Sequence, residues 1–195
     1  MATKQASPRA LRSILQLHIE LRGSRPKVWR RVLVPDTITL EQLHIVILRA
    51  FGWGGGHLYE FVTSQGDRYG SSDPFDAAPD VMSGEKVKLT TVLRTATVEY
   101  VYDFGDNWQH RVQVEKTLAP DSAIALPMCV GGACATPPDD CGGIPGYADF
   151  VRVMADPSDP EHKHLAEWIG QDTWDAKAID FSEINARLAE IQLWR

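Results

Sequence analysis

The stretch Tyr100-Val101-Tyr102-Asp103-Phe104-Gly105-Asp106-Asn107-Trp108-Gln109-His110 decides the fold, because it predicts a β-hairpin in the middle of the chain. Two runs of strand-forming residues flank a Gly-Asp-Asn turn. Period-two alternation places every second side chain of each arm on one face of a sheet. These side chains are Val98, Tyr100, Tyr102 and Phe104 on the first arm and Trp108, His110, Val112 and Val114 on the second.

The hairpin turn carries more polar side chains than a turn requires. Asp103, Asp106 and His110 are candidate catalytic residues, because carboxylates and an imidazole can act as general acid and base or can bind a metal ion. Two observations favour the structural alternative. An aspartate in a turn more often binds its own backbone, which applies to Asp106. Strand alternation aims Asp103 away from the face that carries His110.

Sequence patterns on the N-terminal side of the hairpin predict three strands and a helix. Residues 14–21 alternate between apolar and polar, and residues 28–34 form a second strand that ends at Pro35. Thr39-Leu40-Glu41-Gln42 has the pattern of a capping box, and apolar residues follow it at helical spacing as far as Phe51. A third strand covers residues 58–62, and Arg68-Tyr69 continues the sheet.

The remaining segments predict loops and helices. Residues 71–84 and 119–146 read as loops, and residues 87–93 as either a strand edge or a short helix. Helices are expected from Tyr147, after Asp159 and from an N-cap at Asp180. Strands first and helices last predict an α+β fold: a mostly antiparallel sheet with one helix between strands and a C-terminal helical segment. Residues 1–12 are expected to be a flexible tail, and residues 13–195 a single domain.

Composition narrows the class of protein. A chain of 195 residues that is 44% hydrophobic can bury a substantial core as one domain. No apolar run approaches the roughly 20 residues that cross a bilayer, and the N-terminus lacks the apolar core of a signal peptide. Three cysteines are too few for a disulfide scaffold and fit a reducing compartment. We therefore predict a cytoplasmic protein without membrane contact.

Charge is distributed unevenly along the chain. The net charge is −6, but residues 1–36 carry eight Lys and Arg against two acidic residues. This basic segment could contact a protein or a nucleic acid, or it could pair with the acidic remainder of the chain. The second alternative is favoured, because surface charge runs are usually solvated or loosely paired.

Three cysteines in the 119–146 segment suggest a possible zinc site. Cys129, Cys134 and Cys141 are separated by four and six residues, and with His110 or His57 as a fourth ligand they could form a tetrahedral centre. A metal would also rigidify a long loop rich in Pro and Gly. Neither spacing matches the short Cys-x-x-Cys pattern, so buried free thiols are the alternative. Zinc is the one cofactor that the sequence suggests.

Aromatic and basic side chains indicate a possible binding surface. Trp29 and Arg31 share one face of the strand over residues 28–34, whereas Arg30 lies on the other face. Tryptophan beside arginine can stack on bases or anchor a peptide. We therefore take Trp29, Arg31, His57 and Trp108 as candidate binding residues. The alternative for most tryptophans is core packing.

Several motifs, taken together and in order, resemble the plasmid pRiA4b ORF-3-like family over about residues 14–185. They are Val28–Pro35, Leu40–His44, Gly52-Trp53, His57–Phe61, Tyr102–His110 and Pro138–Tyr147. The resemblance implies a protein associated with plasmids or other mobile elements, without a specific activity. Some proteins that resemble this family are labelled resolvases, but the sequence does not support this activity. A serine recombinase needs a nucleophilic serine amid several arginines and a basic helix pair, and the sequence shows neither. The expected C-terminal helices carry Asp and Glu at least as often as Lys and Arg, which is unlike a phosphate-contacting surface.

Two hypotheses follow from the sequence. The first is a binding or interaction module that serves mobile-element biology. The second is a metal-dependent enzyme whose site lies between the 103–110 hairpin and the 129–147 cysteine loop.

Overall fold

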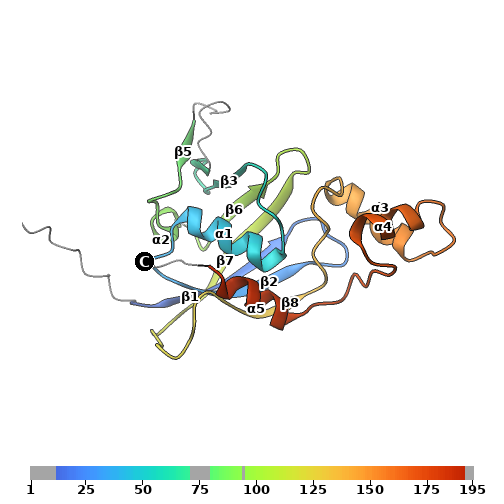
Figure 1. The fold of residues 1–195 in the computed structure, drawn as a ribbon. Helices are drawn as coiled ribbons and strands as arrows, with labels where there is room; N and C mark the ends of the chain where they lie inside the picture. The colour runs from blue at the N-terminus through green and yellow to red at the C-terminus, as the bar shows by residue number, and fades with distance from the viewer. Residues whose placement is uncertain (1–11, 71–79, 94, 192–195) are drawn as a thin grey trace, which may run out of the picture.

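A single eight-stranded sheet forms the body of the protein (Figure 1). The computed structural model describes residues 12–70, 80–93 and 95–191. The predicted tail therefore lies outside the described residues except for its last residue, and so does most of the predicted 71–84 loop. The strands are β1 (Ile14–Leu21), β2 (Trp29–Pro35), β3 (Tyr59–Val62), β4 (Arg68–Gly70), β5 (Val81–Ser83), β6 (Thr97–Tyr102), β7 (Trp108–Leu118) and β8 (Met128–Ala133).

The strand order is β5-β4-β3-β6-β7-β1-β2-β8. All neighbouring strands run antiparallel except β4 and β5, which are parallel. Strands β1 and β7, which pair with each other inside the sheet, alternate apolar and polar residues over most of their length, so each buries one face. The mostly antiparallel α+β fold expected from the sequence is confirmed.

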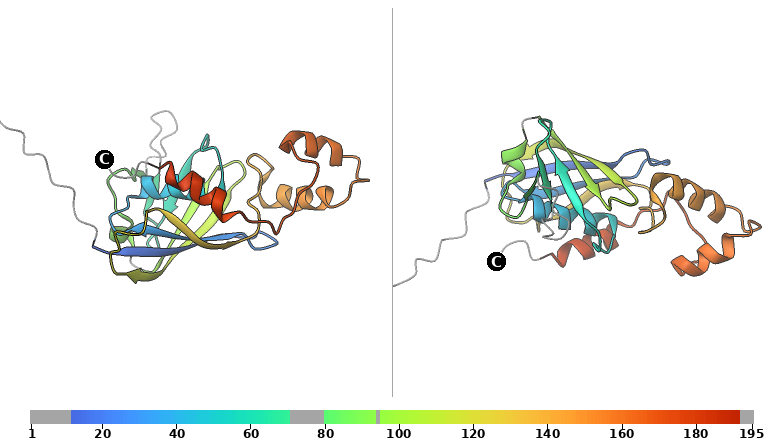
Figure 2. Two further views of the ribbon diagram at one scale, coloured as in Figure 1. Left: turned by 60° about the horizontal axis from the view of Figure 1, so that its bottom comes forward. Right: turned by 90° about the horizontal axis from the view of Figure 1, so that it is seen from above.

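Five helices accompany the sheet in the described residues. They are α1 (Leu40–Phe51), α2 (Leu89–Val92), α3 (Gly143–Met154), α4 (His162–Ile169) and α5 (Phe181–Ala189). Helices α1 and α5 lie on the same face of the sheet, whereas α3 and α4 project beyond one end of it as a helical arm (Figures 1 and 2). None of the helices in the described residues is both long and apolar enough to span a membrane.

Local signals place the ends of two helices correctly. The Thr39 hydroxyl accepts a hydrogen bond from the Gln42 amide, and the Gln42 side chain accepts one from the Thr39 amide, which completes the capping box of α1. The Asp180 carboxylate accepts hydrogen bonds from two amides of the first turn of α5. Helix α1 packs Leu40, Leu43, Val46 and Ile47 into the core.

The predicted hairpin is strands β6 and β7. Tyr100 pairs with His110 and Tyr102 pairs with Trp108 in the register of the two strands, and all four side chains are buried. The prediction was wrong at Phe104, whose side chain is 50% exposed. Its alternation ends there because the chain has already left the strand at Tyr102 and entered the turn.

Three segments without a clear sequence pattern have regular structure. The expected 119–146 loop contains strand β8 and the start of α3, and the expected 71–84 loop contains strand β5. The ambiguous 87–93 segment holds the short helix α2. The edge strands β5 and β8 have three and six residues, so they bury too few side chains for a two-residue period of apolar residues to be recognisable in the sequence.

A β-bulge turns Glu115 toward its partner. Gln16 of β1 faces Lys116 of β7, but the next residue, Leu17, faces Val114, so Glu115 has no opposite residue. Its carboxylate accepts two hydrogen bonds from the Arg31 guanidinium, at 2.6 and 2.7 Å. This pair holds the pKa of the Glu115 carboxyl at about 2.

Two histidines are buried in the aromatic core. The His44 ring stacks on Tyr59 at a centroid distance of 3.5 Å, and its Nδ1 lies 2.8 Å from the Tyr100 hydroxyl. The His110 ring is fully buried and meets the rings of Phe51 and Trp53 edge to face. Burial lowers the pKa of each imidazole from 6.5 to about 3.

The buried histidines make stability depend on pH. Each takes up a proton near pH 6.5 in the unfolded chain but stays neutral in the fold, so the stabilisation is complete above pH 6.5 and decreases as the pH falls toward 3. Between pH 7 and 5 the free energy of unfolding should fall by up to about 2 kcal/mol per histidine. Urea denaturation at both pH values measures this. His44→Gln should reduce the decrease, whereas the exposed His164→Gln should not; an equal decrease in all three proteins would contradict it.

Arg30 is a buried cation without a carboxylate partner in the described residues. Only 2% of the residue is exposed. Its guanidinium donates hydrogen bonds to four oxygens and lies 5.3 Å from the centre of the Phe51 ring. The acceptors are the carbonyls of Trp29, Ala50 and Ala133 and the hydroxyl of Thr136. Burial lowers the pKa of Arg30 to about 10. The side chain thus joins β2, the end of α1, strand β8 and the following loop.

Lysine should not replace Arg30, because an ammonium group lacks the planar donor geometry that reaches these acceptors. We expect Arg30→Lys to lower the free energy of unfolding by at least about 2 kcal/mol, since it leaves buried carbonyls without donors. Arg111→Lys, at an exposed position of β7, is the matched control and should change stability by less than about 0.5 kcal/mol. Chemical denaturation at pH 7 compares them. Equal stability of the two variants would refute the role of Arg30.

Candidate functional site at the hairpin turn

Three segments that are far apart in the sequence meet at the turn between β6 and β7. They are the turn itself, residues 52–57 after α1, and residues 134–143, which lead from β8 into the first residue of α3. Hydrogen bonds link all three: the Trp53 indole donates to the Pro137 carbonyl at 3.0 Å, and the Gly142 amide donates to the Asp106 carboxylate at 3.1 Å. The Gly54 amide donates to the Asp139 carboxylate at 3.1 Å.

Asp103 shapes the turn and also faces the neighbouring segment. Its φ is +54°, in the left-handed region that Asp and Asn tolerate better than most residues. One carboxylate oxygen, Oδ1, accepts a hydrogen bond from the Gly105 amide at 2.9 Å, which forms an Asx turn. The other oxygen, Oδ2, lies 3.6 Å from Nδ1 of His57. Asp103 lies beyond the end of β6, so strand alternation does not set its direction; its carboxylate faces His57 and is not grouped with His110.

His57 lies between two carboxylates. Its Nδ1 faces Asp103, and its Nε2 lies 3.1 Å from Oδ1 of Asp140. A nitrogen of His57 and one oxygen from each aspartate lie within 4.8 Å of one another, and in the described residues no other group of three His, Cys, Asp or Glu side chains converges in this way. Imidazole and carboxylate groups so placed can transfer protons or bind a cation.

Hydrogen bonds hold the 134–143 loop on the body. Asp106 anchors the loop through the Gly142 amide, rather than binding its own backbone as the commoner turn role predicts. Gly143 packs so closely against the turn that a Cβ at this position would lie 2.4 Å from the Asp106 carbonyl oxygen. These contacts fix the position of the loop on the body of the protein without the need for a metal ion.

Negative charge accumulates where the segments meet. The pKa of Asp139 is raised by burial and by the charges of Asp140 and Asp103. Burial raises the pKa of the Cys141 thiol to about 12, and the carboxylates of Asp106, Asp139 and Asp140 add to the effect. This thiol is therefore protonated at neutral pH and is a poor nucleophile.

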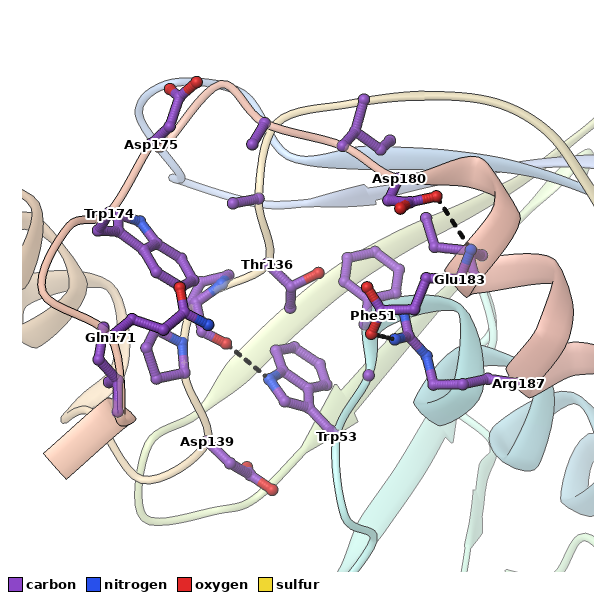
Figure 3. A pocket seen from close by; sticks show the side chains of 18 of the residues that line it. Phe51, Trp53, Thr136, Asp139, Gln171, Trp174, Asp175, Asp180, Glu183 and Arg187 are labelled. Carbon is purple, nitrogen blue, oxygen red and sulfur yellow. Dashed lines mark hydrogen bonds and ion pairs between the residues drawn. The ribbon is translucent and has the colours of Figure 1, made fainter.

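A pocket of about 710 Å³, which Asp139 helps to line, opens between the sheet and the helical arm (Figure 3). Figure 3 shows Trp174 and Gln171 facing Trp53 across the pocket, with Glu183 and Arg187 of α5 along one side. Its volume is in the range of small-molecule sites.

The predicted zinc ligands are not brought together. The predicted ligands are Cys129, Cys134, Cys141 and His110. No three of these four side chains place their ligand atoms within 4.8 Å of one another. His110 lies in the aromatic core, where its Nδ1 is 3.0 Å from the Trp108 carbonyl oxygen. The Cys129 thiol donates to the Gly131 carbonyl within strand β8. All three thiols are free.

The predicted binding residues fall in different places. Trp108 is fully buried and stacks on Trp53 at 5.6 Å, so it belongs to the core. Trp29 is half-buried; its ring stacks on His18 at 5.0 Å and carries the Arg31 guanidinium at 5.1 Å. Of the predicted binding residues, His57 alone belongs to the three-residue cluster.

Two residues of the site, Asp139 and Asp140, were not among the candidates from the sequence. The signal for them was the run of paired acids in Pro138-Asp139-Asp140-Cys141, which the cysteine spacing overshadowed. Asp140 has a φ of +60°, which no sequence pattern indicates for a non-glycine residue.

Known proteins share the sequence and the fold of this chain. The model of the family described as plasmid pRiA4b ORF-3-like protein matches residues 13–183, so the chain belongs to this family. It is 34% identical to the uncharacterized protein y4hQ of Sinorhizobium fredii (strain NBRC 101917 / NGR234), over 92% of each sequence. The crystal structure of MM3350, a protein of unknown function from Methanosarcina mazei Go1, is similar with a TM-score of 0.79 and 31% identity. The structural similarity covers 89% of this chain and 98% of the MM3350 chain.

A side chain at Gly143 should disturb the contact between loop and turn. Gly143→Ala places a Cβ against the Asp106 carbonyl at a position where φ is +67°, so we expect a loss of about 2 kcal/mol or more in unfolding free energy. Gly56→Ala is the matched control, because nothing lies within 4 Å of its Cβ. Thermal unfolding of both variants measures the difference, and a Gly143→Ala protein as stable as Gly56→Ala would disprove the contact.

Proposed function

We propose that this protein is a binding module whose ligand occupies the pocket between the sheet body and the helical arm. The observation that supports this is the lining of the pocket, which combines aromatic rings and carboxylates around one opening. The aromatic residues are Phe51, Trp53, Trp168 and Trp174, and Trp168 is 46% exposed. Exposed tryptophans beside a concave surface are typical of binding sites.

Charge in the pocket favours a positively charged ligand. Both arginines of the lining are engaged within the protein: Arg30 is buried, and Arg187 donates to the Arg49 carbonyl and pairs with Glu183. The carboxylates of Asp139, Asp175 and Asp180 also line the pocket, and among the described residues none of them forms an ion pair with a Lys or Arg side chain. A cation can lie against carboxylates and over tryptophan faces. The ligand we propose is therefore an amine or guanidinium that carries a flat or apolar group.

The basic N-terminal segment supports a protein or nucleic-acid partner less well. Within the described part of this segment, Arg22, Lys27 and Arg31 form ion pairs with glutamates, and Arg30 is buried. A partner at this segment therefore stays a prediction. The plasmid in the family's description supports a role in mobile-element biology, and the three free thiols support a cytoplasmic location.

A metal-dependent enzyme is the second candidate. The observation that favours it is the position of His57, Asp103 and Asp140 between the hairpin turn and the cysteine loop, where the sequence had suggested a site. Asp139 lies between this cluster and the pocket. A substrate in the pocket would therefore lie near groups that can transfer a proton.

Fragment binding tests the pocket. Amine-bearing aromatic fragments and matched carboxylic acids are compared by ligand-observed NMR and by quenching of tryptophan fluorescence. We expect the amines to bind and the acids not to bind. The double variant Asp175→Asn/Asp180→Asn keeps the size of both side chains and the helix cap, since asparagine is a good N-cap. It should weaken amine binding by about two- to five-fold for each charge removed.

Glu167→Gln, on the exposed face of α4 and outside the pocket lining, is the control and should bind the amines as the wild type does. Acids that bind as tightly as the amines would rule out the proposed ligand class. The same conclusion would follow if the double variant bound the amines unchanged.

A further inference from the structure

We propose that His57, Asp103 and Asp140 bind a divalent transition-metal cation such as Mn²⁺ or Zn²⁺. This site is different from the cysteine site suggested by the sequence. It also goes beyond ligand binding in the pocket, which requires no metal. Three observations carry the proposal: the convergence of the ligand atoms, the excess of carboxylates around them, and the mixture of nitrogen and oxygen donors.

The three side chains converge, although a cation would require them to move closer together. Nδ1 of His57 is 3.6 Å from Asp103, Nε2 is 3.1 Å from Asp140, and a set of one atom from each of the three residues fits within 4.8 Å. Around a cation with bonds of about 2.1 Å, neighbouring ligand atoms lie about 3 to 3.4 Å apart. The Asp140 side chain is 68% exposed, so rotation about its side-chain bonds can close the remaining distance. The Asp103 side chain is held by the turn and provides the fixed ligand.

Carboxylates outnumber cations around these atoms. Asp103, Asp106, Asp139 and Asp140 all belong to the junction, and their charges act on one another and on Cys141. In the described parts of the chain, the ion pairs of these four carboxylates involve His57 alone, and no Lys or Arg. A divalent cation would offset this negative charge, because like charges at such distances repel one another. Carboxylates left without any counter-charge would oppose the packing of loop against turn.

The donor set indicates the kind of cation. One imidazole and two carboxylates suit Mn²⁺, Zn²⁺ and similar ions, whereas Mg²⁺ and Ca²⁺ prefer oxygen ligands alone. Three protein ligands leave coordination positions for water, and the exposed Asp140 places these positions toward solvent.

Titration with Mn²⁺ tests the site directly, because bound Mn²⁺ loses the EPR signal of the free ion. The full chain is purified without a histidine tag and stripped of metal, and Zn²⁺ is then added as a competitor. We expect one Mn²⁺ per chain, displaced by Zn²⁺. Asp140→Asn and Asp103→Asn should each weaken Mn²⁺ binding at least ten-fold. Asparagine tolerates a positive φ and can accept the hydrogen bond of the Asx turn, so both variants should fold.

Two controls make the outcome decisive. Cys141→Ser removes a ligand of the cysteine site and should leave Mn²⁺ and Zn²⁺ binding unchanged; loss of binding in this variant would overturn the proposal in favour of the cysteine loop. His164→Ala, on the exposed part of α4, should also bind as the wild type does. Absence of Mn²⁺ and Zn²⁺ binding by the wild type at millimolar concentration would overturn the proposal. So would unchanged binding in both aspartate variants with native circular dichroism. None of these results depends on the pocket ligand.

Discussion

The buried guanidinium of Arg30 is the interaction on which the arrangement of the site depends. A cation removed from water requires oxygen acceptors around it, and Arg30 finds them on strand β2, at the end of α1, on β8 and at Thr136. These acceptors lie on segments distant in sequence, so their positions are set together by one planar group. The chain that leaves β8 at Ala133 is thereby directed along the end of α1, toward the hairpin turn. The pocket and the His57 cluster both lie along this path.

The loop that follows β8 forms a wall of both sites. Its carbonyl at Pro137 and its carboxylate at Asp139 accept hydrogen bonds from Trp53 and Gly54, which also belong to the segment after α1. Asp140, the next residue, turns back to His57 through a left-handed backbone conformation. Pocket and cluster are adjacent because Asp139 lines the pocket and Asp140, the next residue of the loop, contacts His57. Because the two sites are adjacent, a binding module and a metal-dependent enzyme are compatible proposals.

Acidic side chains serve two purposes in this protein. Asp180 caps a helix and Asp103 forms an Asx turn, and both roles follow from the affinity of a carboxylate for backbone amides. Glu115 instead neutralises Arg31 on the open face of the sheet, beside Trp29. The surface first suspected of binding, around Trp29 and Arg31, is thus largely satisfied by its own contacts. The carboxylates of Asp139 and Asp140 lack such Lys or Arg partners in the described residues, which is why the chemistry of the protein is better sought there.

The amino-acid sequence alone determined the elements whose causes are local. Alternation in Tyr100–His110 identified the hairpin, the Thr39–Gln42 pattern marked the start of α1, and Asp180 marked the start of α5, because each depends on neighbours within a few residues. Tertiary structure alone decided that Arg30 is buried, that a bulge releases Glu115 toward Arg31, and that His57 meets Asp103 and Asp140. These contacts join residues tens of positions apart, and a spacing pattern carries no information about such distances. The cysteines illustrate the difference: they are close in sequence, but strand β8 and the turn into α3 carry them apart.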